Sequence, residues 1–301
     1  INSIFQNTFS KKAHGKLFSI TRMLMTLFTM VSAFLAGKFM DLGPDNYKIV
    51  LFAGAVTGTL SFVFLGLIDR KIEYNSKERK GTPFKLFKEI LKTNREFLLF
   101  EISFTLYGLG FMFMLPVVPI YLIDELNFTY GQMGLVKGIL GRIFIVIFLP
   151  LAEVVYDRIS VWKMFSLSQI FLFFYPLGFL VTHFLPDSAI VFDFIILTAT
   201  LKEFIIYISF LFFSLGMTGI HIVWNLGSMH FAKGEDSMTY QGIHVTVTGM
   251  RGLLGPLLSY IVLTLFNYNT VFVISSTLFL TAGIFACFVR PKLLKTKRQL
   301  R

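Results

Sequence analysis

Seven ionisable residues of this sequence lie inside long apolar stretches, where a charge needs a reason to be present. They are Arg22, Glu101, Lys137, Arg142, His221, His244 and Arg251. A charged side chain in the apolar interior of a membrane costs several kcal/mol unless it faces protein or water. The three apolar stretches near 47–68, 161–184 and 270–289 carry no such charge in their interiors. The charged stretches are therefore predicted to line an internal cavity.

Arg251 is the strongest candidate for binding an anion. It lies about eleven residues into its apolar stretch, and His244 and Thr248 share its face at helical spacing. A guanidinium stays charged, so near the middle of a membrane it needs an anionic partner, a substrate or a cluster of carbonyl groups. The alternative is a structural arginine held by helix-end carbonyls.

A polar stripe is predicted on the apolar stretch 204–231. Its members recur every three or four residues and are Ser214, Thr218, His221, Asn225 and Ser228. The pattern indicates a wet helix face, with Trp224 beside it as an aromatic wall for a substrate. The alternative for Trp224 is helix packing with a hydrogen-bonded indole.

Lys137 is a second candidate for holding an anionic group. The glycines around it, Gly131, Gly134, Gly138 and Gly141, form a smooth surface for a neighbouring helix. Arg142 follows five residues later, about 140° around an α-helix, so the two side chains are predicted to point in different directions. One would serve the cavity and the other a packed ion pair.

Glu101 and His221 are candidates for proton coupling, because a carboxylate can carry a proton and histidine exchanges protons near physiological pH. His221 and His244 can equally be core histidines satisfied by their neighbours. The interior charges, four basic groups against Glu101, lean positive and favour an organic anion or a zwitterion as substrate.

These residues must be positioned by membrane-spanning helices. Of the 301 residues, 55% are hydrophobic and 37 are phenylalanine, and the mean hydropathy is +0.71. Lipid cannot satisfy an open sheet edge, so an all-α polytopic bundle of about eight transmembrane helices is expected. The predicted helices span 17–39, 47–68, 97–123, 130–155, 161–184, 204–231, 240–266 and 270–289. The segment 188–203 is predicted to be an interfacial helix or a helix extension.

The distribution of basic residues predicts the topology. About 21 Lys and Arg residues fall on one alternating set of loops and about three on the other, which places both chain ends in the cytoplasm. The predicted organisation is the end of an N-terminal bundle over 1–69, a basic linker over 70–96, a six-helix bundle over 97–290 and a basic cytoplasmic tail over 291–301. Within the linker, 83–92 is expected to form a short amphipathic helix at the inner membrane surface.

Several kinds of chemistry are disfavoured by composition. Cys287 is the single cysteine, so disulfides, metal ligation and thiol chemistry lack their usual clusters. The formal charge of +11 is spread over short segments between apolar runs rather than over one basic face, so nucleic acid is not expected as a partner. No glycine-rich phosphate loop is present, and no cofactor is expected. The expected partners are the lipid bilayer, a small-molecule substrate and a coupling proton or sodium ion, with the protein as a monomer.

The order of these elements resembles the major facilitator superfamily. Two helices, a long basic loop, six helices and a basic tail correspond to helices five to twelve of its six-plus-six fold, which implies an N-terminal truncation. The stretch YDRISVWK at 156–163 resembles the loop signature of that superfamily. The resemblance implies that Asp157 and Arg158 form a charged latch at the inner gate; a plain helix-end ion pair is the alternative. The stretches WNLG at 224–227 and YQGIHVTVTGMRG at 240–252 are similar to uncharacterised bacterial members.

The resemblance implies a secondary transporter of the bacterial inner membrane, either a symporter or a uniporter, that moves a small solute by alternating access. Two other functions stay open. A membrane enzyme using His221 or His244 would need a carboxylate or asparagine partner, and none lies near His244 in the sequence. Haem binding by the two histidines would make the protein an electron carrier.

Overall fold

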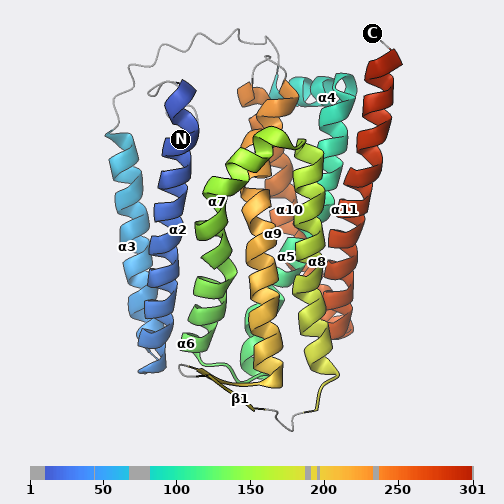
Figure 1. The fold of residues 1–301 in the computed structure, drawn as a ribbon. Helices are drawn as coiled ribbons and strands as arrows, with labels where there is room; N and C mark the ends of the chain where they lie inside the picture. Colours follow the sequence, from blue (N-terminus) through green and yellow to red (C-terminus); the bar gives the residue numbers. More distant parts are fainter. Residues whose placement is uncertain are drawn as a thin grey trace.

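The computed structural model describes residues 11–43, 45–67, 82–186, 191–194, 197–232 and 237–299. Within them lie eight helices long and apolar enough to cross a membrane, as the sequence predicts. The helices run side by side, and Figure 1 shows α4 at one end of the bundle and β1 at the other. We call these the α4 end and the hairpin end.

The helices of the first half of the chain are α2 (Lys11–Asp41), α3 (Asn46–Gly66), α4 (Pro83–Thr93), α5 (Arg95–Asp124), α6 (Tyr130–Met133) and the π-helical segment η1 (Gly134–Leu140). They are followed by α7 (Gly141–Arg158), α8 (Val161–His183), α9 (Leu201–Ala232), α10 (Ser237–Leu265) and α11 (Tyr268–Gln299). Helix α11 thus continues into the stretch predicted as a basic tail.

Local side chains fix several helix starts. The Asn94 side chain accepts the Phe97 amide at the start of α5, and Ser160 accepts the Lys163 amide at the start of α8. Thr129 and Gln132 form a reciprocal capping box on α6. These caps satisfy amide groups that the first turn of a helix leaves without partners.

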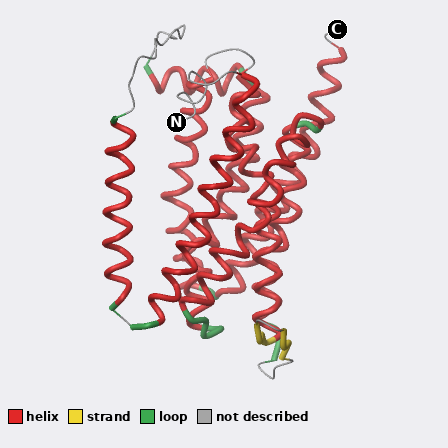
Figure 2. Tube along the Cα trace, turned by 60° about the vertical axis from the view of Figure 1, so that its left-hand side comes forward, coloured by secondary structure: helices red, strands yellow, loops and turns green. Residues whose placement is uncertain are grey.

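Packing joins most helices into one bundle. Helix α8 packs against α9 and α11, α5 packs against α10 and α11, and α7 packs against α9. Helix α2 lies against α6, η1 and α7, whereas α3 contacts α2 and has no buried residue. Figure 2 shows α3 standing apart from the other helices. The division of the chain into a linker and two bundle halves stays a prediction.

The bundle has two apolar cores. One lies toward the α4 end and contains Phe100, Phe104 and Phe165. The other lies toward the hairpin end and contains Tyr121, Phe179 and Phe272. Phe213 of α9 packs against both cores.

The amphipathic helix predicted over 83–92 is present as α4. Its apolar face is partly covered by the bundle, because Ile90 is fully buried and Phe87 and Leu91 pack against the core, whereas Phe84 stays exposed. Lys85, Lys88 and Lys92 are exposed.

The prediction for 188–203 is wrong over most of its described part. Val191–Phe194 and Leu197–Thr200 form the antiparallel strands β1 and β2, and only the last residues extend α9 as a helix. The Glu203 carboxylate accepts the Thr200 amide at 2.7 Å, and the Thr200 hydroxyl accepts the Glu203 amide at 3.2 Å. This reciprocal cap starts α9 where the hairpin ends.

Candidate functional site

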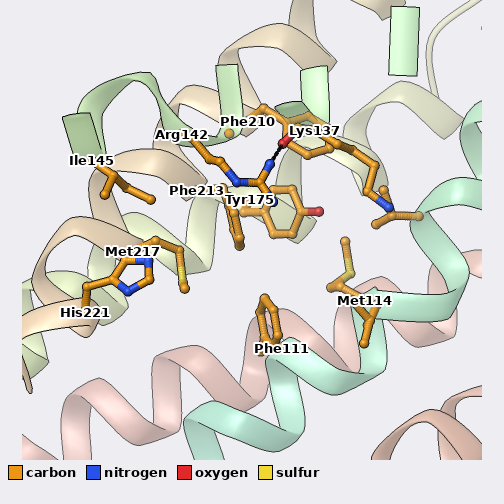
Figure 3. A pocket seen from close by; sticks show the side chains of 13 residues that line it. Phe111, Met114, Lys137, Arg142, Ile145, Tyr175, Phe210, Phe213, Met217 and His221 are labelled. Carbon is orange, nitrogen blue, oxygen red and sulfur yellow. Dashed lines mark hydrogen bonds between the residues drawn. The ribbon is translucent and has the colours of Figure 1, made fainter. Parts of the chain in front are cut away.

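A cavity of about 290 Å³ lies between the two cores of the bundle. Its walls come from α5, η1, α7, α8 and α9, and Figure 3 shows the side chains that line it. They are Phe111, Met114, Leu115, Val118, Lys137, Gly141, Arg142, Ile145, Tyr175, Phe210, Phe213, Met217 and His221. None of these described lining residues carries a carboxylate.

Lys137 and Arg142 both line this cavity, contrary to the prediction that they point in different directions. The prediction assumed α-helical geometry, but Lys137 lies in η1, a π-helical segment. Hydrogen bonds in a π-helix join residues five apart, so residues i and i+5 lie nearly above one another. The local change of helix type therefore turns the arginine toward the lysine.

Two contacts support the transition from η1 to α7. The Arg142 guanidinium donates to the carbonyl oxygen of Lys137. The hydroxyl of Ser214, on α9, accepts the Phe144 amide at 2.9 Å. Ser214 thus supplies an acceptor from a neighbouring helix just after the π-helical hydrogen-bond pattern ends.

The glycine face of η1 packs against α2, as the sequence predicts for a smooth surface. A Cβ added at Gly134 would lie 2.8 Å from the Ala33 carbonyl oxygen, and one at Gly138 would lie 3.0 Å from the Ala33 Cβ. At the end of α2, the Asp41 carboxylate accepts the Gly131 amide at 2.9 Å. One face of this helix therefore closes on α2 while another carries the cations into the cavity.

A second cavity of about 230 Å³ adjoins the first. It is lined by Met25, Thr26 and Thr29 of α2 together with Leu149. Arg142, Ile145 and His221 line both cavities. The two cavities therefore lie next to each other, and the second one reaches α2.

Glu101, His244 and Arg251 form a separate buried charge cluster between α5 and α10. The Glu101 carboxylate lies 2.8 Å from His244 Nδ1, and the three residues are 4%, 0% and 5% exposed. Arg251 is close enough to Glu101 and Tyr107 to interact electrostatically with both. Its guanidinium also donates to the carbonyl oxygen of Phe104.

Aromatic rings enclose this cluster. The Arg251 guanidinium carbon lies 5.0 Å from the Phe104 ring centroid, 5.8 Å from Tyr107 and 5.7 Å from Trp224. The Phe104 and Trp224 rings each lie 4.7 Å from the imidazole of His244. Cation–π attraction and the Glu101 carboxylate together compensate a buried guanidinium that would otherwise be costly.

The comparison with protein families agrees with this architecture. Residues 1–201, about two thirds of the chain, match the Major Facilitator Superfamily. The chain belongs to the major facilitator superfamily. It is therefore an integral, multi-pass membrane transporter. No curated protein matches the chain significantly.

The structure places the predicted site residues of this facilitator in two groups. Lys137 and His221 line the cavities, whereas His244, Arg251 and Trp224 belong to the charge cluster. Thr248 lies half-buried, with its hydroxyl donating to the carbonyl oxygen of His244. The Asn225 amide donates to the carbonyl oxygen of His221 at 2.6 Å.

The predicted polar stripe of α9 mainly joins helices of the facilitator. Ser214 bonds to α7, Thr218 donates to the Ser214 carbonyl oxygen, and Ser228 donates to the Gln241 side chain of α10. Among the stripe residues, His221 lines the cavities. Asp157 and Arg158 end α7, and their side chains lie outside the described part of the structure.

Two lining residues of the facilitator were missed as site residues from the sequence. The sequence does not indicate that Arg142 lines the cavity with Lys137, because no periodicity in the sequence reveals a π-helical segment. Tyr175 lies on α8, a helix without interior charges, so no signal in the sequence marks it as a cavity residue. Its hydroxyl has no hydrogen-bond partner among the described residues and is drawn on the cavity side in Figure 3.

The two histidines on which the other functions considered from the sequence depend lie in different surroundings. The carboxylate partner that His244 lacks nearby in the sequence is supplied by Glu101 from α5. The imidazole of His244 is fully buried among aromatic rings. His221 lines the two cavities, whereas His244 lies in the buried charge cluster.

Proposed function

We propose that this facilitator moves a small organic anion across the membrane by alternating access and binds it between Lys137 and Arg142. The observation that carries the proposal is a 290 Å³ cavity lined by two cations and a histidine without a described carboxylate. Among the described residues, no carboxylate forms an ion pair with Lys137 or Arg142. An anionic ligand would provide the missing counter-charge in a site of low dielectric constant.

Alternating access is supported by how α2 meets the rest of the protein. At the hairpin end α2 approaches α6 and η1 so closely that a Cβ at Gly37 would lie 2.3 Å from the Tyr130 carbonyl oxygen. In Figure 1, α7 leans away from α2 toward the α4 end. Movement of α2 relative to α7 would change access to the two adjoining cavities, because Arg142 and His221 line both of them.

The excess of Lys and Arg in the loops at the α4 end supports a cytoplasmic location for that end. With that orientation, the close contact of α2 with α6 and η1 lies on the outer side of the membrane. The bacterial inner membrane is the proposed location, and the protein is proposed to act as a monomer.

Coupling to protons is proposed at the charge cluster. Glu101 and Arg251 carry opposite charges, and His244 extends the cluster from Glu101 Oε1. A proton added to this buried group leaves an excess positive charge among aromatic rings, which favours a change of conformation. The titratable or charged groups facing Glu101 and His244 are Arg251 and, next to it, Tyr107. We do not propose sodium coupling, because the described residues offer no comparable cluster for a sodium ion.

The proposal is tested by counterflow in proteoliposomes. Radiolabelled carboxylates, neutral amides and amines of the same size are offered to wild type, Lys137→Ala and Arg142→Gln. Carboxylate counterflow is expected to fall by about tenfold or more in each variant, since about 1.4 kcal/mol of lost binding corresponds to a factor of ten. Lys48→Ala and Arg95→Gln, at exposed positions, are matched controls that keep full activity. Equal flux of carboxylates in all five proteins would refute the assignment of the site.

A further inference from the structure

The cavity wall carries one group of polar side chains and is otherwise largely apolar, with His221 beside Met217. In Figure 3, Lys137, Arg142 and Tyr175 gather on one side, and Phe111 lies across the cavity from them. Phe111 and Met114 come from α5, and Phe213 and Met217 come from α9. A ligand that fills this space must present different chemistry to its two ends.

The polar side offers three groups that can donate to one oxyanion. They are the ammonium of Lys137, the guanidinium of Arg142 and the hydroxyl of Tyr175. A carboxylate can accept several such hydrogen bonds at once, and charge-assisted bonds to it are about twice as strong as neutral ones. The polar side is therefore matched to a single carboxylate.

The apolar side is built from rings and thioethers. The Phe111 and Phe213 rings are nearly parallel, 14° apart, with centroids separated by 6.1 Å. A planar ligand ring can extend this stack, and the methionine side chains can adjust to its edge. The one other polar side chain among the lining residues, His221 beside Met217 in Figure 3, already has another interaction partner, so a second carboxylate at this end would lose its hydration with little compensation.

We propose that the substrate is an amphipathic monocarboxylate with an aromatic or comparably bulky apolar body. The carboxylate lies between Lys137, Arg142 and Tyr175, and the apolar body lies against Phe111, Phe213 and Met217. A cavity of about 290 Å³ is at the small end of the range for ligand pockets, so the ligand is the size of a substituted benzene. This inference rests on the proposed function, because it specifies the anion bound at the same site.

Direct binding to the purified protein in lipid nanodiscs tests the inference. Radiolabelled phenylpropanoate is the probe, and unlabelled phenylpropanoate, propanoate, succinate and phenylpropanamide compete with it. Phenylpropanoate is expected to bind at least about tenfold more tightly than each of the other three. The amide keeps the ring without the charge, while propanoate and succinate keep the charge without the ring.

Two variants locate the apolar end. Phe213→Leu is expected to weaken phenylpropanoate binding about tenfold and to leave propanoate binding unchanged. Phe212→Leu is the matched control, because Phe212 packs against Phe171 and Phe174 and does not line the cavity. Monodisperse elution of both variants in size-exclusion chromatography shows that they are folded. The competition series on the wild-type protein tests the inference independently of the two variants.

The outcomes separate the two proposals. Succinate or propanoate binding as tightly as phenylpropanoate would overturn the amphipathic substrate and leave the anion site intact. Phenylpropanamide binding as tightly as phenylpropanoate would refute the anion site itself. No binding of any carboxylate would overturn both.

Discussion

At the scale of single residues, the structure separates two kinds of buried charge. Lys137 and Arg142 face a cavity without a described carboxylate, so their charge is available to a ligand. Arg251 donates to the Phe104 carbonyl oxygen, lies against three aromatic rings and interacts electrostatically with Glu101, so part of its charge is compensated inside the protein. The residue that seemed best suited to bind an anion from the sequence thus lies in the cluster proposed to carry protons.

The proposed role of Glu101 leads to a prediction about driving force. Glu101→Gln keeps the size of the side chain but removes the group that binds a proton. Accumulation of carboxylate driven by an inwardly directed proton gradient is expected to fall to the level without a gradient, while counterflow persists. Both are measured in proteoliposomes, with Glu89→Gln on the exposed face of α4 as the control.

Removing Glu101 also leaves Arg251 without its carboxylate, so loss of folding must be excluded. The double variant Glu101→Gln, Arg251→Gln restores charge neutrality and is expected to be at least as stable as the single variant. Gradient-driven accumulation that persists in a folded Glu101→Gln protein would show that coupling lies elsewhere.

At the scale of elements, the segment from Tyr130 to Arg158 combines two tasks in one helix. Its glycines allow α2 to approach, and its π-helical stretch brings two cations to the cavity. The same segment therefore links the contact with α2 to the binding site. A displacement of α2 would change the surroundings of Arg142, because Arg142 lines both cavities.

Gly134→Ala is predicted to disturb this contact. The added methyl group would lie 2.8 Å from the Ala33 carbonyl oxygen and 3.0 Å from the Phe34 Cα, and neither backbone atom can move without α2. Gly242→Ala is the matched control, because nothing lies within 4 Å of a Cβ there and alanine favours a helix by about 1 kcal/mol over glycine. The midpoint of thermal unfolding in detergent is expected to fall for Gly134→Ala and to stay or rise for Gly242→Ala. Equal midpoints would mean that the α2 contact contributes nothing.

At the scale of the whole molecule, the helices define two ends but do not by themselves assign sides of the membrane. The excess of Lys and Arg in the loops at the α4 end is the basis for the proposal that this end is cytoplasmic. The loops lie at two ends of the bundle, and the length of a membrane-spanning helix separates these ends. The orientation is therefore testable by chemical access from each side.

Access is measured with a membrane-impermeant thiol reagent in a Cys287→Ser background. Lys88→Cys on α4 is expected to react in inverted vesicles and not in intact cells. Asp45→Cys, in the exposed connection between α2 and α3 at the hairpin end, is expected to react in intact cells. The reverse pattern would overturn the orientation.

The sequence determined the class of this protein, because runs of about twenty apolar residues can be stable only as membrane-spanning helices. It also predicted that the helices with buried charges line an internal cavity, and the structure places Lys137 and His221 at cavities and Glu101 in the charge cluster. The hairpin of β1 and β2 was not predicted, because its short apolar strands resemble helical segments in composition.

Only the tertiary structure decided which charges share a site. Helical periodicity relates residues along one helix, but Glu101 meets His244 across 143 positions of sequence. The direction of Arg142 depends on a π-helical segment whose hydrogen bonds are supported by Ser214 on another helix, and no local pattern encodes that support. The apolar pattern along a helix is set by whether each face meets lipid, water or protein, so it can be read from the local sequence. The pairing of polar groups is set by which helices pack together, so it cannot.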